Sequence, residues 1–212
     1  PDTLSTKESM MLGTAGLTAG LCIEEIYNHT PINNLEVIVS GSTGGVGSIA
    51  VKLLSLLEAK VTAITGKKNS EQYLYDLGSS NVINRKKFID SKRSPLSNGV
   101  YHAAVDAVGG NILSSILTSM QYNGIITACG NVAGANFTTS VFPFILRKNR
   151  LIGIDSATCS IPIREKIWNK FSTFWKLKNL DHICKVIDLS SLDEEIKKIL
   201  CGEQVGRIVV QL

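Results

Sequence analysis

The sequence lacks the patterns that hold metal ions. It contains five cysteines and three histidines but no CxxC pair, and no cysteine stands at metal-ligand spacing from a histidine. A structural zinc site is therefore not expected. The thiols are expected to be buried or idle in a reducing compartment, which predicts a cytoplasmic protein without a bound metal.

Long apolar runs and strong net charge are also missing. A membrane span needs about 20 apolar residues, and the nearest candidate, 10–23, is interrupted by Gly13, Gly16 and Gly20. The net charge of +4 is spread along the chain, which argues against nucleic acid as the main partner. No signal peptide is visible and the chain opens on Pro1, so we expect a piece of a longer protein.

The most informative segment is an apolar run at 36–39, a glycine-rich turn at 40–47 and a predicted helix at 45–57. Glycines let the backbone approach an anion, and a helix N-terminus offers free N–H groups and a positive dipole. The GxGxxG pattern is imperfect, because Ser42 takes the place of its first glycine. The segment predicts a diphosphate site; the alternative is a loop that only turns the chain.

The end of the second predicted strand, 60–65, indicates which dinucleotide binds. An NAD site carries an acidic residue there for the ribose 2′-hydroxyl. This sequence has Thr65, Gly66, Lys67 and Lys68, and the next carboxylate is Glu71. A hydroxyl, a glycine and two cations favour a 2′-phosphate, which predicts NADPH over NADH. The alternative is a solvated basic turn.

Strands and helices alternate along most of the chain. This predicts an α/β fold with a doubly wound, six-stranded parallel sheet covered on both faces. Strands are predicted at 36–39, 60–65, 81–84, 100–106, 123–128 and 150–154, and helices at 5–27, 45–57, 70–77, 110–119 and 140–147. Residues 85–98 are predicted to be irregular.

The pattern changes after residue 158. A helix at 161–177 is predicted to bury one apolar face formed by Ile163, Ile167, Phe171, Phe174 and Trp175. A strand at 185–189, a helix at 191–201 and a strand at 206–210 follow. These closing elements are expected to lie outside the six-stranded sheet.

Several separated motifs resemble one family. They are GTAGLTA at 13–19, GGVG at 44–47, TGK at 65–67, VDAVGG at 105–110, CG at 129–130, FPFILR at 142–147 and GRIVV at 206–210. The sequence is similar to the medium-chain dehydrogenase/reductase superfamily, within it to the zinc-free quinone oxidoreductase group and its acrylyl-CoA reductase type.

The resemblance implies a Rossmann domain that binds NADPH beside a GroES-like catalytic domain. It divides the chain into a linking helix at 1–30, the NADP-binding domain at 31–178 and a segment at 179–212 that returns to the catalytic domain. That catalytic domain, with the catalytic residues, is expected to be absent, so the catalytic residues are unknown. The implied reaction is hydride transfer to a conjugated carbonyl, with an enone, a quinone or an acyl-CoA such as acrylyl-CoA as substrate.

The resemblance also implies residue roles. Ser42 and Thr43, with the amides of Gly44, Gly45 and Val46, are expected to hold the diphosphate. Thr65, Gly66, Lys67 and Arg85 are expected to hold the 2′-phosphate, and Asn131 to make a backbone contact. Phe144, Ile145 and Ser156 are expected to line the nicotinamide side, although Phe144 and Ile145 equally fit a core role.

Two other groups have several interpretations. Asp106 suits a hydrogen-bonded structural acid or a ribose contact better than a general acid. The basic cluster 147–150 stands where a helix is expected to end, which explains it by dipole complementation. If the substrate is a CoA thioester, Arg147, Lys148 and Arg150 are candidate ligands of its phosphates.

The sequence leaves two alternative functions open and also predicts an oligomeric state. The chain could be a non-catalytic NADPH-binding sensor or interaction module, or a Rossmann methyltransferase, although methyltransferases usually carry an acid after the second strand. The strand at 150–154 is expected at the sheet edge, which predicts a homodimer formed through it.

Overall fold

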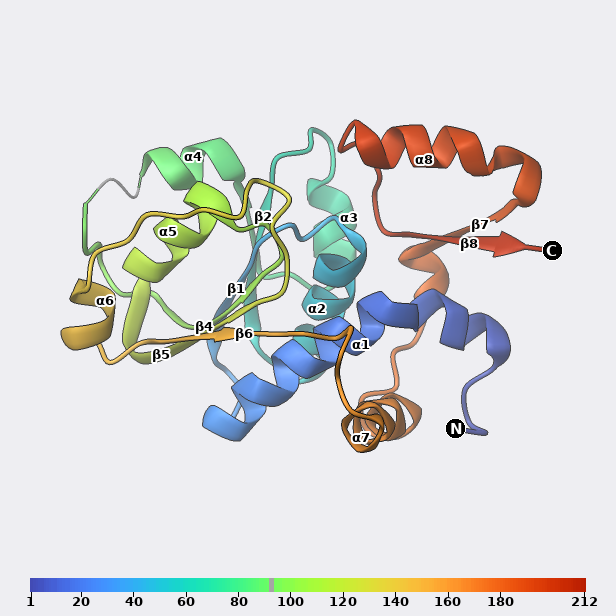
Figure 1. The fold of residues 1–212 in the computed structure, drawn as a ribbon, viewed down its shortest axis with the longest axis horizontal. Helices are drawn as coiled ribbons and strands as arrows, with labels where there is room; N and C mark the ends of the chain where they lie inside the picture. Colours follow the sequence, from blue (N-terminus) through green and yellow to red (C-terminus); the bar gives the residue numbers. More distant parts are fainter. Residues whose placement is uncertain (92–93) are drawn as a thin grey trace.

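The computed structural model describes residues 1–91 and 94–212. Six strands form one parallel sheet in the order β3-β2-β1-β4-β5-β6, which confirms the predicted doubly wound α/β fold (Figure 1). The strands are β1 (Glu36–Val39), β2 (Lys60–Thr65), β3 (Asn81–Asn84), β4 (Tyr101–Asp106), β5 (Met120–Ala128) and β6 (Arg150–Gly153). Strand order reverses between β1 and β4, and open α/β sheets bind ligands at the carboxyl ends of the strands beside such a reversal.

Helices cover both faces of this sheet. Val37 and Val39 of β1 belong to a core cluster shared with α1 and α2, whereas Ile38 points into a second cluster with α5. The helices are α1 (Thr6–His29), α2 (Gly45–Leu56), α3 (Glu71–Asp76), α4 (Arg85–Asp90), α5 (Gly110–Thr118), α6 (Phe142–Ile145), α7 (Ile161–Ser172) and α8 (Leu192–Leu200). Alternate residues of a strand point to opposite faces, so burial on both sides explains the continuous apolar runs.

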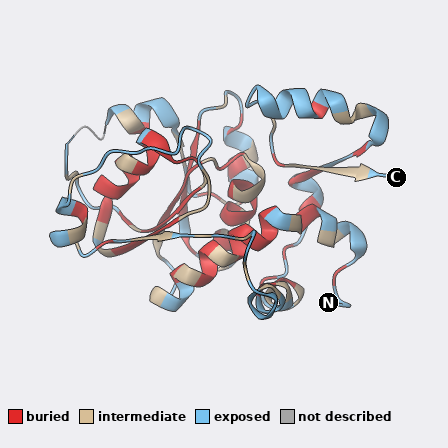
Figure 2. Ribbon diagram, viewed as in Figure 1, coloured by how far each residue is buried: buried red, intermediate tan, exposed pale blue. Residues whose placement is uncertain are grey.

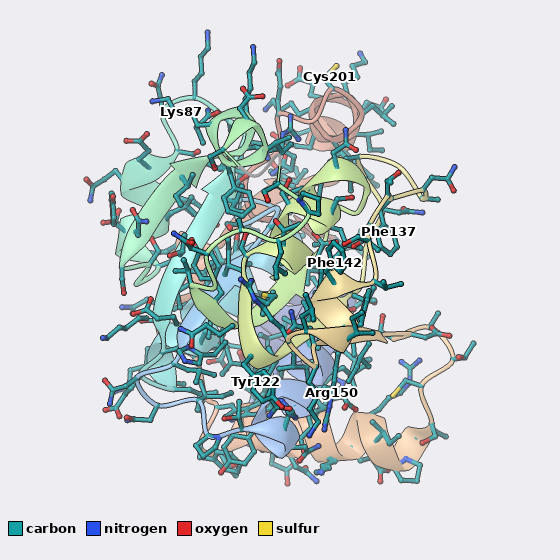
Figure 3. The ribbon with its side chains drawn as sticks, turned by 90° about the vertical axis from the view of Figure 1, so that its left-hand side faces the viewer. Lys87, Tyr122, Phe137, Phe142, Arg150 and Cys201 are labelled. Atoms are coloured by element: carbon teal, nitrogen blue, oxygen red, sulfur yellow. The ribbon has the colours of Figure 1, made fainter. Side chains whose placement is uncertain are left out.

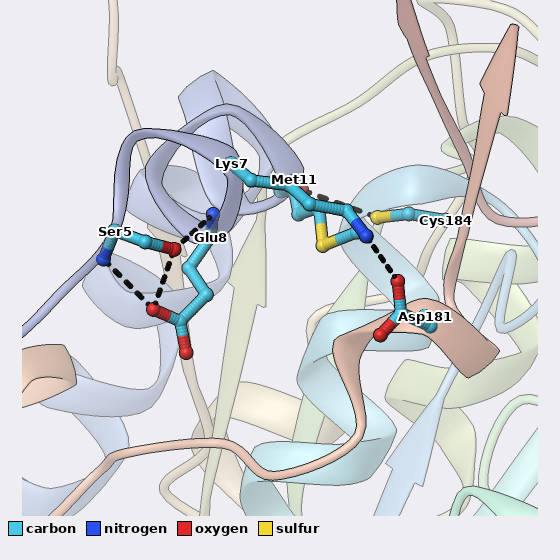
Figure 4. Close-up of polar contacts among 6 residues, drawn as sticks. All are labelled: Ser5, Lys7, Glu8, Met11, Asp181 and Cys184. Atoms are coloured by element: carbon cyan, nitrogen blue, oxygen red, sulfur yellow. Dashed lines mark hydrogen bonds and ion pairs between the residues drawn. The ribbon is translucent and has the colours of Figure 1, made fainter.

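Helix α1 begins with the capping box that its sequence predicts. The Ser5 hydroxyl accepts from the Glu8 N–H, and the Glu8 carboxylate accepts from the Ser5 N–H (Figure 4). The expected uninterrupted helix is wrong at Gly13, where φ is +48° and the helix kinks. A Cβ at this position would lie 2.7 Å from the guanidinium of Arg207, so a glycine is needed there.

The prediction that residues 85–98 are irregular is wrong for 85–90, which form α4. Asn84 caps this helix, because its side-chain oxygen accepts from the N–H groups of Lys86 and Lys87. Phe88 then anchors it in the second core cluster. Residues 92–93 of the predicted segment lie outside the described residues.

The apolar face predicted for 161–177 is only partly correct. Ile167, Phe171 and Trp175 are buried, whereas Ile163 and Phe174 are exposed. The helical spacing fails at the end because α7 stops at Ser172. Within the described residues, no helix is long and apolar enough to cross a bilayer.

The closing strands lie outside the six-stranded sheet, as predicted. β7 (Cys184–Asp188) and β8 (Arg207–Gln211) form a separate parallel pair, and α8, which connects them, is largely exposed (Figure 2). Short 3-10 helices, η1 (Leu180–His182) and η2 (Leu189–Ser191), flank β7. Lys7 of α1 binds Asp181 of η1 at 2.8 Å and ties this unit to the start of the chain (Figure 4).

Candidate functional site

The glycine-rich turn connects β1 to α2 at the carboxyl edge of the sheet. The Ser42 hydroxyl donates to the Val39 carbonyl at 2.7 Å, and the Ser42 N–H donates to the Ile64 carbonyl at 3.3 Å. Ser42 is fully buried, so these bonds fix the shape of the turn. A Cβ at Gly47 would lie 2.2 Å from the Gly41 carbonyl oxygen, which only a glycine avoids.

The N-terminus of α2 is suited to hold an anion. Its N-cap, Gly44, provides no side-chain cap, and the first turn of the helix carries no acidic residue. The first N–H groups of the helix, at Gly45 and Val46, therefore have no partner within the helix, and the positive end of the helix dipole faces the space beyond the turn. Thr43 precedes them and is 4% exposed. The structure thus brings Ser42 to Val46 together in one turn.

The residues predicted for a 2′-phosphate gather at the ends of β2 and β3. Arg85, the first residue after β3, lies directly over Gly66, because a Cβ at Gly66 would be 2.9 Å from the guanidinium carbon. The Thr65 hydroxyl accepts from the Lys67 N–H at 3.1 Å. The Lys67 ammonium donates to the Gln204 carbonyl, and burial lowers the pKa of Lys67. The structure therefore places Arg85 beside Gly66, and their binding of a 2′-phosphate stays a prediction.

A cavity of about 390 Å³ extends from Arg85 along this edge of the sheet. It lies between α4, the start of α5 and the loop after β5. Its lining residues are Arg85, Ile89, Gly110, Asn111, Ile112, Ala133 and Asn136. A larger hollow of about 500 Å³ lies on α7 and contains none of the predicted site residues. The cavity at Arg85 is the candidate ligand site, because it adjoins the basic pocket formed by Gly66, Lys67 and Arg85.

Asp106 is a buried, hydrogen-bonded acid at the end of β4. Its carboxylate accepts from the Ser40 hydroxyl and from the N–H groups of Val108 and Gly109. Burial raises the pKa of Asp106, although these hydrogen bonds oppose the rise. The acid holds the turn between β4 and α5, which agrees with the predicted structural role.

Asn131 and the three residues expected on the nicotinamide side occupy different surroundings. Asn131 is exposed in the loop after β5, and its carbonyl accepts from the Gly134 N–H at 2.9 Å. Phe144 packs against the second core cluster, whereas Ile145 is 68% exposed. The Ser156 hydroxyl accepts from the Thr18 hydroxyl of α1 at 2.8 Å. Their contacts with a cofactor stay predictions.

Gly206, just before β8, and Arg207, its first residue, reach the glycine turn, which the sequence does not predict. The Gly206 N–H donates to the Thr43 carbonyl at 2.8 Å. The Arg207 side chain donates to the Met11 carbonyl at 2.8 Å, and its Cδ would be 3.4 Å from a Cβ at Gly45. The sequence signal at these positions is the GRIVV motif at 206–210, which by itself does not indicate a contact with the turn.

Part of the basic cluster 147–150 forms hydrogen bonds within the protein. Arg147 donates to the carbonyls of Ser97, Thr118 and Met120, so the structure gives its guanidinium a role other than phosphate binding. Arg150 lies 2.9 Å from the Nδ1 atom of His29.

Comparison with known proteins identifies the family. Residues 45–177 match the family described as zinc-binding dehydrogenase. The chain is 38% identical to the putative quinone oxidoreductase YhfP of Bacillus subtilis and 34% identical to the acrylyl-CoA reductase AcuI of Ruegeria pomeroyi. Both alignments cover all of this chain, 65% of YhfP and 64% of AcuI, so the chain spans less than two thirds of these relatives.

Solved structures agree with this assignment. Escherichia coli YhdH with bound NADPH superposes with a TM-score of 0.92 at 36% identity, covering 99% of this chain and 65% of that one. Bacillus subtilis yhfP with bound NAD superposes with a TM-score of 0.94 at 38% identity, covering 100% and 65%.

The family description names zinc, but no group of three or more His, Cys, Asp or Glu side chains among residues 1–91 and 94–212 is arranged to hold a metal ion. This part of the protein therefore does not fit a zinc site. The matched family, the superposed structures and the separated motifs all agree. The chain belongs to the zinc-binding dehydrogenase family, within the medium-chain dehydrogenase/reductase superfamily that its motifs resemble.

Proposed function

We propose that this chain binds NADPH and forms the cofactor-binding portion of an enzyme that reduces a conjugated carbonyl. The observation that carries the proposal is a pair of anion sites on one edge of the sheet. The first is the uncapped N-terminus of α2, and the second is the basic pocket of Gly66, Lys67 and Arg85. A dinucleotide with a 2′-phosphate presents anionic groups suited to both sites.

Bound NADPH would supply the hydride that adds to the β-carbon of an enone, a quinone or an acyl-CoA such as acrylyl-CoA. The residues of this chain bind and orient the cofactor. The turn from Ser42 to Val46 holds the diphosphate, and Thr65, Lys67 and Arg85 hold the 2′-phosphate. Asp106 fixes the adjoining turn through its own hydrogen bonds.

The substrate class is supported by the relatives, one named as an acrylyl-CoA reductase and another as a putative quinone oxidoreductase. We also propose the division into 1–30, 31–178 and 179–212. The exposed apolar side chains of Ile196, Ile199 and Leu200 on α8 support packing of the last segment against further protein. The free cysteines support a reducing compartment such as the cytoplasm.

A homodimer formed through the β6 edge is part of the proposal. β6 is an edge strand, and apolar side chains of α6 and its neighbouring loop are exposed nearby (Figure 3). Phe142 is 42% exposed and Leu146 57% exposed. Light scattering over a concentration series tests this: a dimer is expected, and a monomer at all concentrations contradicts it.

Titration of the purified chain with NADPH and NADH tests the cofactor assignment. We expect saturable NADPH binding and clearly weaker NADH binding. Equal affinity contradicts the basic pocket, and binding of neither nucleotide contradicts the proposed function. The relative crystallised with NAD makes this comparison the informative one. The sensor alternative would be favoured if a longer form of the protein, with the expected catalytic domain, bound NADPH but did not reduce enones.

A further inference from the structure

The loop at 155–160, which connects β6 to α7, leaves the sheet at the edge where the glycine turn lies (Figure 1). The Ile154 N–H donates to the Ala128 carbonyl at 2.9 Å, so the pairing of β6 with β5 continues up to the start of this loop. The six strands of the sheet are parallel, and their carboxyl ends therefore share one edge. The loop thus begins at the ligand-binding edge expected for an open α/β sheet.

Arg164, in the first turn of α7, bonds the backbone of this loop. Its guanidinium donates to the Ser156 carbonyl at 2.8 Å and to the Ala157 carbonyl at 2.9 Å. Its Nε atom donates to the Cys159 carbonyl at 2.9 Å. Side chains of a helix lean toward its N-terminus, which explains how Arg164 reaches back over the loop. An irregular loop lacks the regular backbone partners of a helix or strand, so these bonds determine its shape.

The Ser156 side chain contacts the part of α1 that lies against the glycine turn. The Thr18 hydroxyl lies 2.8 Å from the Ser156 hydroxyl and 2.8 Å from the Thr14 carbonyl. Ala15, on the same stretch of α1, would be 3.5 Å from a Cβ at Gly45. Thr18 has one hydroxyl proton. If Ser156 receives it, Ser156 can donate its own proton to a ligand; if Thr14 receives it, Ser156 donates to Thr18 and can accept from a ligand.

The strand order shows which half of a dinucleotide would lie near this loop. The basic pocket lies at the ends of β2 and β3, and the glycine turn follows β1. A dinucleotide with its 2′-phosphate in the pocket and its diphosphate at the turn extends toward β4, β5 and β6. Its nicotinamide half would therefore approach the loop after β6. The nicotinamide carboxamide has an acceptor oxygen and a donor NH2 group, so it suits Ser156 in either hydrogen-bonding arrangement.

We propose that Arg164 is a positioning residue for the nicotinamide half of the cofactor, because it holds the loop at 155–160 in the shape that presents the Ser156 hydroxyl to the carboxamide. This inference rests on the proposed binding of NADPH. Arg164 bonds carbonyls of the protein, so it acts through Ser156. Lysine cannot replace it, because a single ammonium lacks the fork of donors with which the guanidinium reaches several carbonyls.

Calorimetric titration with two ligands tests the inference. NADPH has both halves, whereas adenosine 2′,5′-bisphosphate has the 2′-phosphate but no nicotinamide half. In Arg164→Ala we expect the dissociation constant of NADPH to rise about 3- to 10-fold, as for one lost hydrogen bond, and that of the bisphosphate to change less than about twofold. Arg164→Lys keeps the charge and should resemble Arg164→Ala. Lys178→Ala removes an exposed cation near the end of the α7 region and should bind both ligands as the parent does.

A double-mutant cycle with Ser156→Ala tests whether Arg164 acts through Ser156. Ser156→Ala should also weaken NADPH selectively, and adding Arg164→Ala to it should cost less than Arg164→Ala costs alone. Additive effects overturn the inference. Equal weakening of both ligands by Arg164→Ala also overturns it, because the arginine then acts through the whole fold. Circular dichroism confirms that each variant is folded.

The two ligands also separate this inference from the proposed function. If the parent binds both ligands and Arg164→Ala binds NADPH as tightly as the parent does, only the inference fails. If the parent binds neither ligand, the proposed function fails and the inference fails with it.

Discussion

Replacement of Lys67 by alanine tests the basic pocket most directly. Lys67 is half-buried beside Gly66, and its ammonium donates to the Gln204 carbonyl. An ammonium has three donors, so two remain for a phosphate in this arrangement. Because burial lowers the pKa of Lys67, the site disfavours an unpaired cation and gains from a bound anion.

The expected loss follows from one charge-assisted hydrogen bond. Such a bond contributes about 1.5–3 kcal/mol, which corresponds to about a 10- to 150-fold rise in the dissociation constant of NADPH. NADH has no 2′-phosphate, so its dissociation constant should change less than about threefold. Loss of the bond to Gln204 should also lower the free energy of unfolding by about 1 kcal/mol, or the melting temperature by about 2–4 °C.

Isothermal titration calorimetry with both nucleotides measures the effect. Lys68→Ala is the matched control, because Lys68 is the next residue and is exposed. It should change NADPH affinity far less than Lys67→Ala does. If Lys67→Ala weakens NADPH and NADH equally, the lysine acts through the fold of the pocket, and its assignment to the 2′-phosphate is refuted.

Three other substitutions test the glycine turn, the ion pairs between α1 and α7, and the core. Gly47→Ala places a Cβ 2.2 Å from a carbonyl oxygen of the turn, so binding of both nucleotides should be lost; Gly153→Ala, where a Cβ meets nothing within 4 Å, should bind normally in the same titration. Burial opposes ionisation of Glu24, but its two lysine partners outweigh burial and lower its pKa. The stability from this ionised group is therefore present above the unfolded pKa of about 4.3 and is lost as pH falls through the lower folded value. Thermal melts should show Glu24→Gln to be less stable than the parent at pH 7, with the gap closing toward pH 3; a gap that persists there contradicts this. Trp175→Ala removes a fully buried ring and should cost about 3–5 kcal/mol in urea unfolding, and a cost below 1 kcal/mol contradicts its core role.

The central sheet is predictable because its signal is local and strong. Strands such as Val37–Val39 are apolar on both faces, and only a strand covered by helices on both sides satisfies that pattern. Helix α4 is missed because one buried residue, Phe88, gives no periodicity, and its start depends on the side-chain cap at Asn84. The helix at 161–177 is overextended because apolar Phe174 continues the spacing after the backbone has left the helix at Ser172.

In the candidate site, too, the features formed by local sequence are predictable and the contacts between distant positions are not. The glycine turn is contained in one stretch of chain, so its sequence predicts its shape, including the need for a glycine at Gly47. The approach of Arg85 to Gly66 is also predictable, since β2 and β3 are neighbouring parallel strands whose ends meet. Two contacts are not predictable in this way: Gln204 with Lys67, and Gly206 with Thr43. Each joins positions more than 130 residues apart, and no local sequence pattern predicts it.

These distant contacts give the closing segment a role in the site itself. Gln204 holds the cation of the basic pocket, and Gly206 holds a carbonyl of the glycine turn, so one short stretch before β8 touches both predicted anion sites. Gly206 has a φ of +66°, and a Cβ there would lie 2.0 Å from the Ile183 carbonyl oxygen, so the backbone path that permits both contacts requires glycine. The segment at 179–212 therefore stabilises the proposed cofactor site even though its strands pair outside the main sheet.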